Sequence, residues 1–192
     1  MKLTFRATGR FVAGTALACA AAALPATALA ATTGPAGHAR PAARTAPAWP
    51  APRCTAHQTE IWLGVGLGGG TAGTIFYPLE FTNVGRHACS LIGFPKVAAI
   101  SAGGHQIGKS SRSLRQRHGF VTLLPGWTAH ANLGIIEAGN VCSHPVNAAS
   151  LKVRAPHQGH STFIPFGFQA CHGKRVLVVG PIRPGVGIPG QN

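Results

Sequence analysis

The sequence predicts an all-β fold, an antiparallel β-sandwich of immunoglobulin-like type with about seven to nine short strands. Three observations support this prediction. Apolar and polar residues alternate with period two in several windows, which is the pattern of half-buried strands. Turns rich in glycine and proline separate these windows. The only helical stripe is a weak one at residues 110–117, so helices are expected to contribute little.

The predicted strands follow one another closely along the chain. In residues 60–67 and 74–81 apolar and polar side chains alternate, and the glycine-rich residues 68–73 predict a hairpin loop between them. Pro78 lies inside the second strand and favours an edge position or a bulge, because proline cannot donate to the ladder. Later windows show the same alternation or a short apolar run, and they predict strands at 97–100, 120–124, 128–135, 151–154 and 176–179.

Residues 1–30 have the pattern of a cleaved export signal. Basic residues precede an apolar run at 11–23, and Ala28 and Ala30 supply the small side chains of a cleavage site. The alternative is a retained membrane anchor. A spanning helix needs about 20 strongly apolar residues, whereas this run is alanine-rich and is broken at Pro25. We therefore expect a protein that is secreted or associated with the cell envelope.

The remaining chain divides into three predicted parts. Residues 31–53 contain five prolines and few large apolar side chains, so they are expected to form a disordered linker that cannot offset its ordering entropy. Residues 54–185 form the predicted β-sandwich domain. Residues 186–192 are expected to be a flexible tail.

The chain is strongly basic. It has 17 Lys and Arg residues against three glutamates and no aspartate. Cleavage would remove Lys2, Arg6 and Arg10, which leaves fourteen basic residues and a net charge near +11. Such a surface attracts an anionic cell-wall polymer, an anionic lipid surface or another extracellular protein. A genome composition rich in arginine is the alternative explanation of the charge.

Four cysteines follow the predicted signal, and in an exported chain they predict two disulfides. The sequence leaves three pairings open. A metal site formed by Cys142, His144 and His172 is the rival interpretation, and it would serve a metal-assisted extracellular enzyme. An oxidising compartment favours disulfides over that site. We weakly favour local pairing, which would join neighbouring segments: Cys54–Cys89 and Cys142–Cys171.

Two glycine motifs imitate nucleotide-binding sites. Residues 103–110 match the P-loop pattern, but that chemistry uses an acidic residue, usually aspartate, near magnesium, and the chain has no aspartate. A β-turn at Gly103 and Gly104 is expected instead. Residues 64–69 match the dinucleotide fingerprint, which must open a helix, whereas here the motif runs from a strand into a loop. We expect no cofactor.

No residue is assigned a catalytic role, so we expect a non-enzymatic monomer. Glu60 and Glu80 fall on predicted outward faces of consecutive strands, where a solvated pair or ion pairs with arginines explain them better than catalysis. A serine triad would lack its usual aspartate. A nucleophilic cysteine would need a free thiol, and all four cysteines are expected in bridges.

One segment has the character of a binding site. Residues 109–118 contain four cations and a histidine, which predict a mobile loop that attracts anions. A solvated loop without a ligand is the alternative. No aromatic residue is interleaved to stack on bases, so no specific nucleic-acid partner is expected. The expected anion-binding residues are Lys109, Arg112, Arg115, Arg117 and His118.

A set of short motifs runs through the predicted domain. They are Leu79–Asn83 running into Cys89–Pro95, Gly104 with Ile107 and Gly108, Val121–Gly126 with Ala129, Cys142, Leu151–Val153, Cys171 and the closing Pro181–Gly185. With these motifs the stretch from Cys54 to Gly185 resembles the actinobacterial secreted domain-of-unknown-function family numbered 4232. The resemblance implies an exported or lipid-anchored β-sandwich with paired cysteines and no established catalytic residues. This chain departs from that pattern in its basicity and its arginine-rich loop.

Overall fold

The computed structural model describes residues 50–65 and 69–187, which consist of strands joined by turns and short 3-10 helices. The predicted all-β class is confirmed, and the immunoglobulin-like type stays a prediction. The described residues belong to one compact unit. Among them, no helix is long and apolar enough to cross a membrane. The predicted export signal and the linker up to residue 49 lie outside the described residues.

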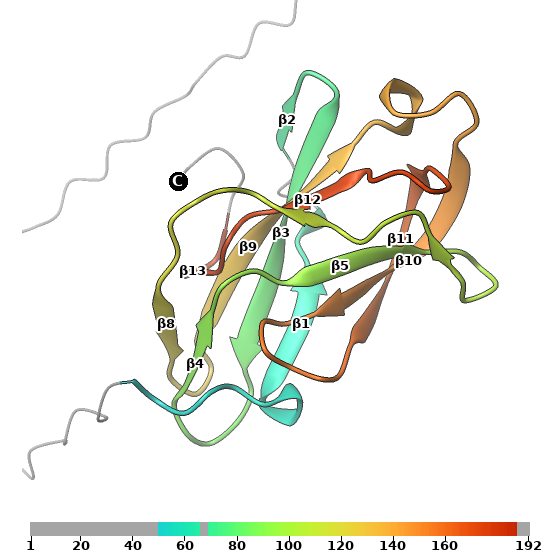
Figure 1. Ribbon diagram of the computed structural model, residues 1–192. Coiled ribbons are helices and arrows are strands. Elements are labelled where there is room, and N and C mark those ends of the chain that lie inside the picture. The colour runs from blue at the N-terminus through green and yellow to red at the C-terminus, as the bar shows by residue number, and fades with distance from the viewer. Residues whose placement is uncertain (1–49, 66–68, 188–192) are drawn as a thin grey trace, which may run out of the picture. The chain divides into compact units, whose positions relative to one another are not determined.

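The strands form three sheets (Figure 1). The largest has the order β1-β3-β9-β12-β7, with β2 beside β3 and β13 beside β9. A four-stranded sheet has the order β11-β10-β5-β6, and β4 pairs with β8. All pairs are antiparallel except β12–β7. The bounds are β1 Thr59–Leu63, β2 Gly69–Thr71, β3 Thr74–Asn83, β4 Cys89–Ile92, β5 Lys96–Ile100, β6 Gln106–Ile107, β7 Arg112–Ser113, β8 Phe120–Leu123, β9 Thr128–Ile136, β10 Val146–Arg154, β11 Thr162–Ala170, β12 Leu177–Val179 and β13 Arg183–Pro184.

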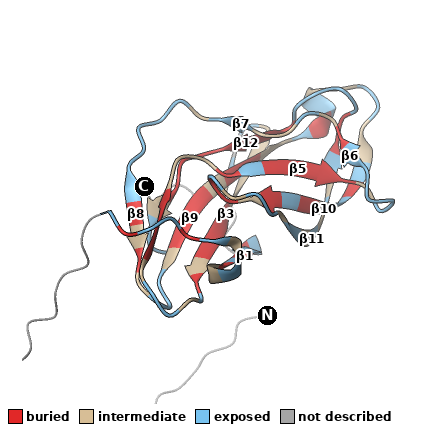
Figure 2. Ribbon diagram, turned by 60° about the horizontal axis from the view of Figure 1, so that its bottom comes forward, coloured by how far each residue is buried: buried red, intermediate tan, exposed pale blue. Residues whose placement is uncertain are grey.

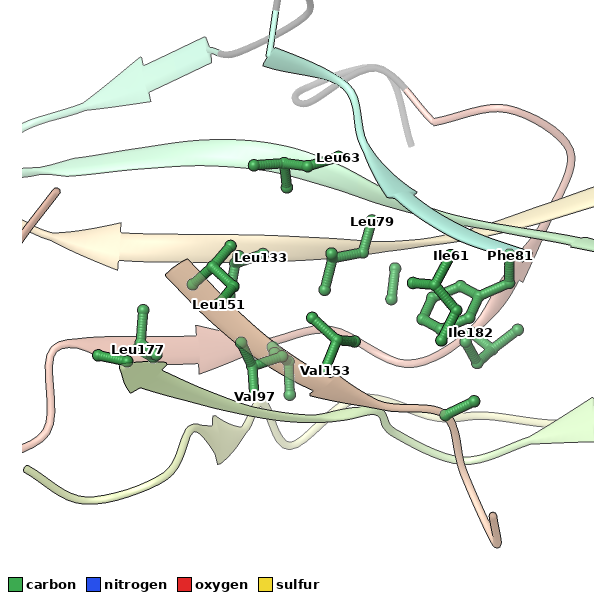
Figure 3. Close-up of a cluster of buried hydrophobic side chains, with 14 of the residues drawn as sticks. Ile61, Leu63, Leu79, Phe81, Val97, Leu133, Leu151, Val153, Leu177 and Ile182 are labelled. Carbon is green, nitrogen blue, oxygen red and sulfur yellow. The ribbon is translucent and has the colours of Figure 1, made fainter. Parts of the chain in front are cut away.

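The two larger sheets face each other across one hydrophobic core, and Figure 2 shows the buried parts of β3, β5, β9 and β10 in red. Side chains alternate along a strand, so β3 and β9 direct every second residue, such as Phe81 and Leu133, toward the opposite sheet. Leu151 and Val153 of β10 approach from that sheet, and Figure 3 shows the two sets meeting. All four are fully buried, and removing such a side chain from water stabilises the fold by about 1.5–3 kcal/mol.

The prediction that Pro78 marks an edge strand or bulge is wrong. β3 lies between β1 and β9, and its register with both is continuous. Pro78 has no N–H to donate to the neighbouring strand. It is tolerated because β1 ends at Leu63, before the residue that would accept this hydrogen bond. The Pro78 carbonyl still accepts a hydrogen bond from the Gly64 N–H at 2.9 Å. A central strand therefore accommodates proline where its neighbour ends.

Other predicted elements also differ from the structure. Residues 110–117 form no helix, because β7 and Leu114 are hydrogen-bonded to β12 instead. The predicted first strand is shorter, since β1 ends at Leu63 and Val65 is exposed. The hairpin turn consists of Ala72 and Gly73, whereas Gly69 and Gly70 belong to β2. β11 was not predicted, because Pro165 and Gly167 interrupt its sequence, but an edge strand tolerates both.

The ordered domain extends beyond both predicted ends. On the N-terminal side, Ser90 hydrogen-bonds the carbonyls of Ala51 and Pro52, so the last residues of the predicted linker are fixed beside β4. On the C-terminal side, Gly187 is buried and its N–H donates to Glu80 at 3.0 Å. The prediction of a flexible tail from residue 186 is therefore wrong for Gly187, and residues 188–192 lie outside the described residues.

Candidate functional site

The two disulfides join the pairs that the sequence favoured. Cys54 is bonded to Cys89 and Cys142 to Cys171, and the residues of each pair are 35 and 29 positions apart. The first bridge joins the start of the domain to β4, and the second joins the β9–β10 connection to the end of β11. Local pairing is thus confirmed.

The second disulfide removes the thiols that the metal interpretation needs. A thiolate is the form of cysteine that binds zinc, and the sulfurs of Cys142 and Cys171 are bonded to each other. His144 forms a local hydrogen bond with Ser143 at 2.9 Å. Among the described residues, no group of three or more His, Cys, Asp or Glu is arranged to hold a metal ion. The proposed site at Cys142, His144 and His172 is therefore not formed.

The segment that matches a P-loop is the hairpin between β5 and β6. The Gly104 N–H donates to the Ser101 carbonyl, and the Ser101 N–H donates to the His105 carbonyl, which closes the turn. Gly104 has a φ of 79°, a conformation that glycine adopts without strain. The predicted β-turn is confirmed, and Lys109 and Ser110 follow the hairpin rather than open a helix.

The basic segment 109–118 is anchored to both sheets at its start, which corrects the expectation of a mobile loop there. Ser111 exchanges hydrogen bonds with Val97 of β5, and the Leu114 N–H donates to Val179 of β12. His118 packs edge-on against Phe94, with the ring centroids 5.0 Å apart. The cationic side chains themselves are exposed, namely Lys109, Arg112, Arg115 and Arg117.

A basic cleft lies on the outer face of the four-stranded sheet. β5 and β10 pair so that Lys96 is opposite Arg154 and Ala98 is opposite Lys152, which places all four side chains on one face. The short side chain of Ala98 leaves a hollow of about 240 Å³ among the longer ones. We call this hollow the basic cleft, and its lining residues are Lys96, Val97, Ala98, Gln106, Ser110, Lys152, Arg154, Gly159 and Ser161.

The cleft concentrates positive charge without a carboxylate in its lining. Lys96 and Arg154 are direct cross-strand neighbours, an arrangement of like charges that destabilises a sheet by up to about 1 kcal/mol. The ammonium of Lys152 lies 5.7 Å from the centre of the Phe163 ring, a cation–π contact beside the cleft. Of the chain's three glutamates, none lines the cleft, so its cations are available to an anion from outside.

A second group of cations adjoins the cleft at Ser110. The Lys109 N–H donates to the Lys174 carbonyl, and Arg175 Nε donates to the Ser110 carbonyl, both at 2.8 Å. These bonds hold residues 108–110 against the turn that follows Cys171. We call Lys109, Lys174 and Arg175 the basic ridge. Because Ser110 belongs to the cleft lining and touches the ridge, the two groups form one continuous basic track.

The opposite wall of the cleft is held by a different set of contacts. This wall is the β10–β11 connection, which contributes Gly159 and Ser161. The amide of Gln158 donates to the Cys54 carbonyl and to Thr59 Oγ1, both at 3.1 Å. One wall is therefore tied to the Cys54–Cys89 bridge, while the ridge side is tied to the turn that begins at Cys171.

Of the cations in this track, only Lys109 was predicted from the sequence. Lys109 was predicted and belongs to the ridge, whereas Arg112, Arg115, Arg117 and His118 are not among the cleft-lining residues. The other track cations come from three separate segments, and only the sheet register and the turn bring them together. Alternating Lys and Arg on a predicted strand at 151–154 was the one available signal. The cations not predicted are Lys96, Lys152, Arg154, Lys174 and Arg175.

The expectation that Glu80 faces solvent is wrong. Its side chain is fully buried, because residues 185–187 cover the outer face of β3 and β9. His130 lies directly opposite Glu80 in the sheet, and its Nδ1 is 2.8 Å from the Gly185 carbonyl. Burial raises the pKa of Glu80 above its ordinary value of 4.5, although the bond from Gly187 and the nearby His130 act to lower it. Glu60 is exposed on β1, opposite Thr82.

Replacing Glu80 with glutamine should remove a pH dependence of stability. The folded state retains the Glu80 proton above pH 4.5 after the unfolded state has lost it, because the folded pKa is raised. Stability from this group is thus present below pH 4.5 and declines as pH rises through the folded pKa. Urea denaturation from pH 4 to about 9 should show that the free energy of unfolding of Glu80→Gln increases relative to that of the parent as pH rises. Glu60→Gln is the control, and the same trend there would contradict this assignment.

Comparison with known proteins identifies the family of this chain. A family model described as "Domain of unknown function (DUF4232)" matches residues 54–183. No curated protein and no solved structure gives a significant match. The matched region contains all four bridged cysteines and almost every strand, including both sides of the basic cleft. The chain therefore belongs to the DUF4232 family of domains of unknown function.

Proposed function

We propose that this protein is a secreted, non-catalytic β-sheet domain that binds an anionic polymer of the cell envelope. The observation that supports this proposal most is the cross-strand pair Lys96–Arg154 in a cleft whose lining has no acidic residue. Like charges directly opposite each other repel, and they destabilise the strand pair in the free protein. A bound polyanion would supply the missing negative charge.

The shape of the basic track suits a polymer better than a single small ion. Cations of the cleft and of the ridge lie on either side of Ser110, so successive anionic groups of one chain can be held along it. The two disulfides and the predicted export signal fit an extracellular setting. Anionic lipid surfaces and acidic proteins carry the same sign of charge, and they are the competing outcomes of the test.

The test compares two variants that lose the same charge at different places. Lys96→Gln/Arg154→Gln removes two cations from the cleft, and Arg115→Gln/Arg117→Gln removes two exposed cations outside it. Binding of sodium polyphosphate is measured by titration calorimetry at low and at high salt. The cleft variant should bind at least about tenfold more weakly, since each charge-assisted hydrogen bond contributes about 1.5–3 kcal/mol before screening. The control variant should lose little.

Three results would count against the proposal. Equal losses in both variants would show that net charge, and not the cleft, governs binding. Binding that is independent of salt would exclude an electrostatic mechanism, because exposed charges are screened beyond about 8 Å at physiological ionic strength. Binding to anionic vesicles but to no soluble polyanion would assign the track to a lipid surface instead.

A further inference from the structure

We propose that the basic cleft is a seat for one tetrahedral oxyanion, the phosphate group of an ester, and that it discriminates against carboxylates. This inference rests on the proposed polyanion function and assigns the chemical class of its ligand. A site for a tetrahedral oxyanion requires donors on more than one side of the ligand, because the oxygens of a phosphate group point in different directions. A carboxylate, by contrast, has two oxygens in one plane and is satisfied by donors from one side.

The cleft supplies donors from two opposite walls. Lys96 and Ser110 come from β5 and the segment after β6, and Lys152, Arg154 and Ser161 come from β10 and the connection to β11. Arg154 contributes a planar guanidinium, which suits two oxygens of one phosphate group. The lysines contribute point charges that can reach the remaining oxygens.

The hydroxyl of Ser110 is prepared to donate to a ligand. Gln106 Nε2 lies 3.5 Å from Ser110 Oγ and 3.0 Å from the Gly108 carbonyl, so the amide is the donor in both contacts. Ser110 Oγ therefore accepts weakly from Gln106 and keeps its own hydrogen for another partner. The Arg175 contact to the Ser110 carbonyl fixes the backbone of this residue without using the hydroxyl.

The size of the cleft and its apolar border favour an ester of phosphate. Its volume of about 240 Å³ is about eight times the share of one water in the liquid, which is enough for a phosphate group and a few attached atoms. Phe163 lies opposite Lys152 on the same outer face and is 57% exposed. Its ring offers an apolar surface to the organic part of an ester beside the cationic seat.

The experiment varies the ligand and the guanidinium separately. The purified chain is titrated with glycerol 3-phosphate, polyphosphate and poly-L-glutamate at equal ionic strength, and chemical shifts of the Ala98 and Gly159 amides report occupation of the cleft. Polyphosphate should bind at least about tenfold more tightly than poly-L-glutamate. Arg154→Lys keeps the charge but loses the planar fork, so it should weaken the phosphate ligands about fivefold. Ser110→Ala should weaken the phosphate ligands in the same direction.

The possible results separate this inference from the function on which it rests. If both polymers bind with equal affinity and Lys96→Gln/Arg154→Gln weakens both, the oxyanion seat is overturned while polyanion binding stands. If neither polymer binds, both proposals fall. Vesicles containing phosphatidylglycerol distinguish the source of the phosphate. Shifts at Ala98 with these vesicles, but with no soluble phosphate ligand, would overturn the seat for a soluble ester and indicate a membrane surface.

Discussion

Replacing all four bridged cysteines with alanine should lower the free energy of unfolding by about 7 kcal/mol, because each disulfide contributes about 3–4 kcal/mol. The estimate follows from the sequence separations of 35 and 29 residues between the bonded cysteines, which set the entropy that each bridge removes from the unfolded chain. Domains of this size are stable by about 5–15 kcal/mol in total. The fourfold variant should therefore lose about half or more of the stability of the parent.

Guanidinium denaturation of the parent and of the two double variants measures these contributions. Cys54→Ala/Cys89→Ala and Cys142→Ala/Cys171→Ala should each shift the transition to lower denaturant. A thiol titration of the denatured, unreduced parent provides the control. The full-length chain should show one free thiol, from Cys19, because the other four cysteines are bonded. Five free thiols would contradict the pairing.

The two double variants should also affect different walls of the basic cleft. Loss of the Cys142–Cys171 bridge releases the turn that holds Lys174 and Arg175 against residues 108–110. Loss of the Cys54–Cys89 bridge frees the backbone of Cys54, whose carbonyl accepts the hydrogen bond from Gln158 in the other wall. Polyphosphate affinity, measured at a temperature where both variants remain folded, should therefore fall in both. A normal affinity in both would show that the walls are positioned without the bridges.

Local sequence patterns predicted which segments form strands better than they predicted which strands lie side by side. Alternation along β3 and β9 identified strands whose apolar side chains form the core. Cysteine count and spacing favoured the observed bridges, because residues of consecutive segments meet in an antiparallel fold. The alternation in β11 was hidden by Pro165 and Gly167, which an edge strand can accept. Sequence periodicity does not reveal which strand lies at an edge.

The candidate site required information that no local window contains. Lys96 and Arg154 are far apart in the sequence, and only the β5–β10 register makes them neighbours. The burial of Glu80 likewise depends on residues 185–187, which return to cover its strand. A rule of alternating inward and outward faces places Glu80 correctly on the outer face. It cannot tell that this face is covered by another segment.

Replacing Gly108 with alanine should destabilise the protein by about 3 kcal/mol and weaken polyphosphate binding. Gly108 has a φ of 66°, which costs an L-residue about 1–2 kcal/mol. A Cβ at this position would also collide with the carbonyl oxygens of Cys171 and Lys174. Both obstacles are backbone atoms of a turn fixed by a disulfide, so they cannot move aside as the end of a flexible side chain can.

Gly104→Ala is the matched control for this substitution. Gly104 has a similar φ of 79°, and no heavy atom of the described chain lies within 4 Å of an added Cβ. The control should cost only the conformational part, about 1 kcal/mol, and should leave binding unchanged because its hairpin tip is outside the cleft. The difference between the two variants in denaturation measures the collision. If Gly108→Ala destabilised the protein no more than Gly104→Ala, residues 108–110 would not be held against the turn. The cleft and the ridge would then not be joined at Ser110, and the basic track would no longer favour a polymeric ligand.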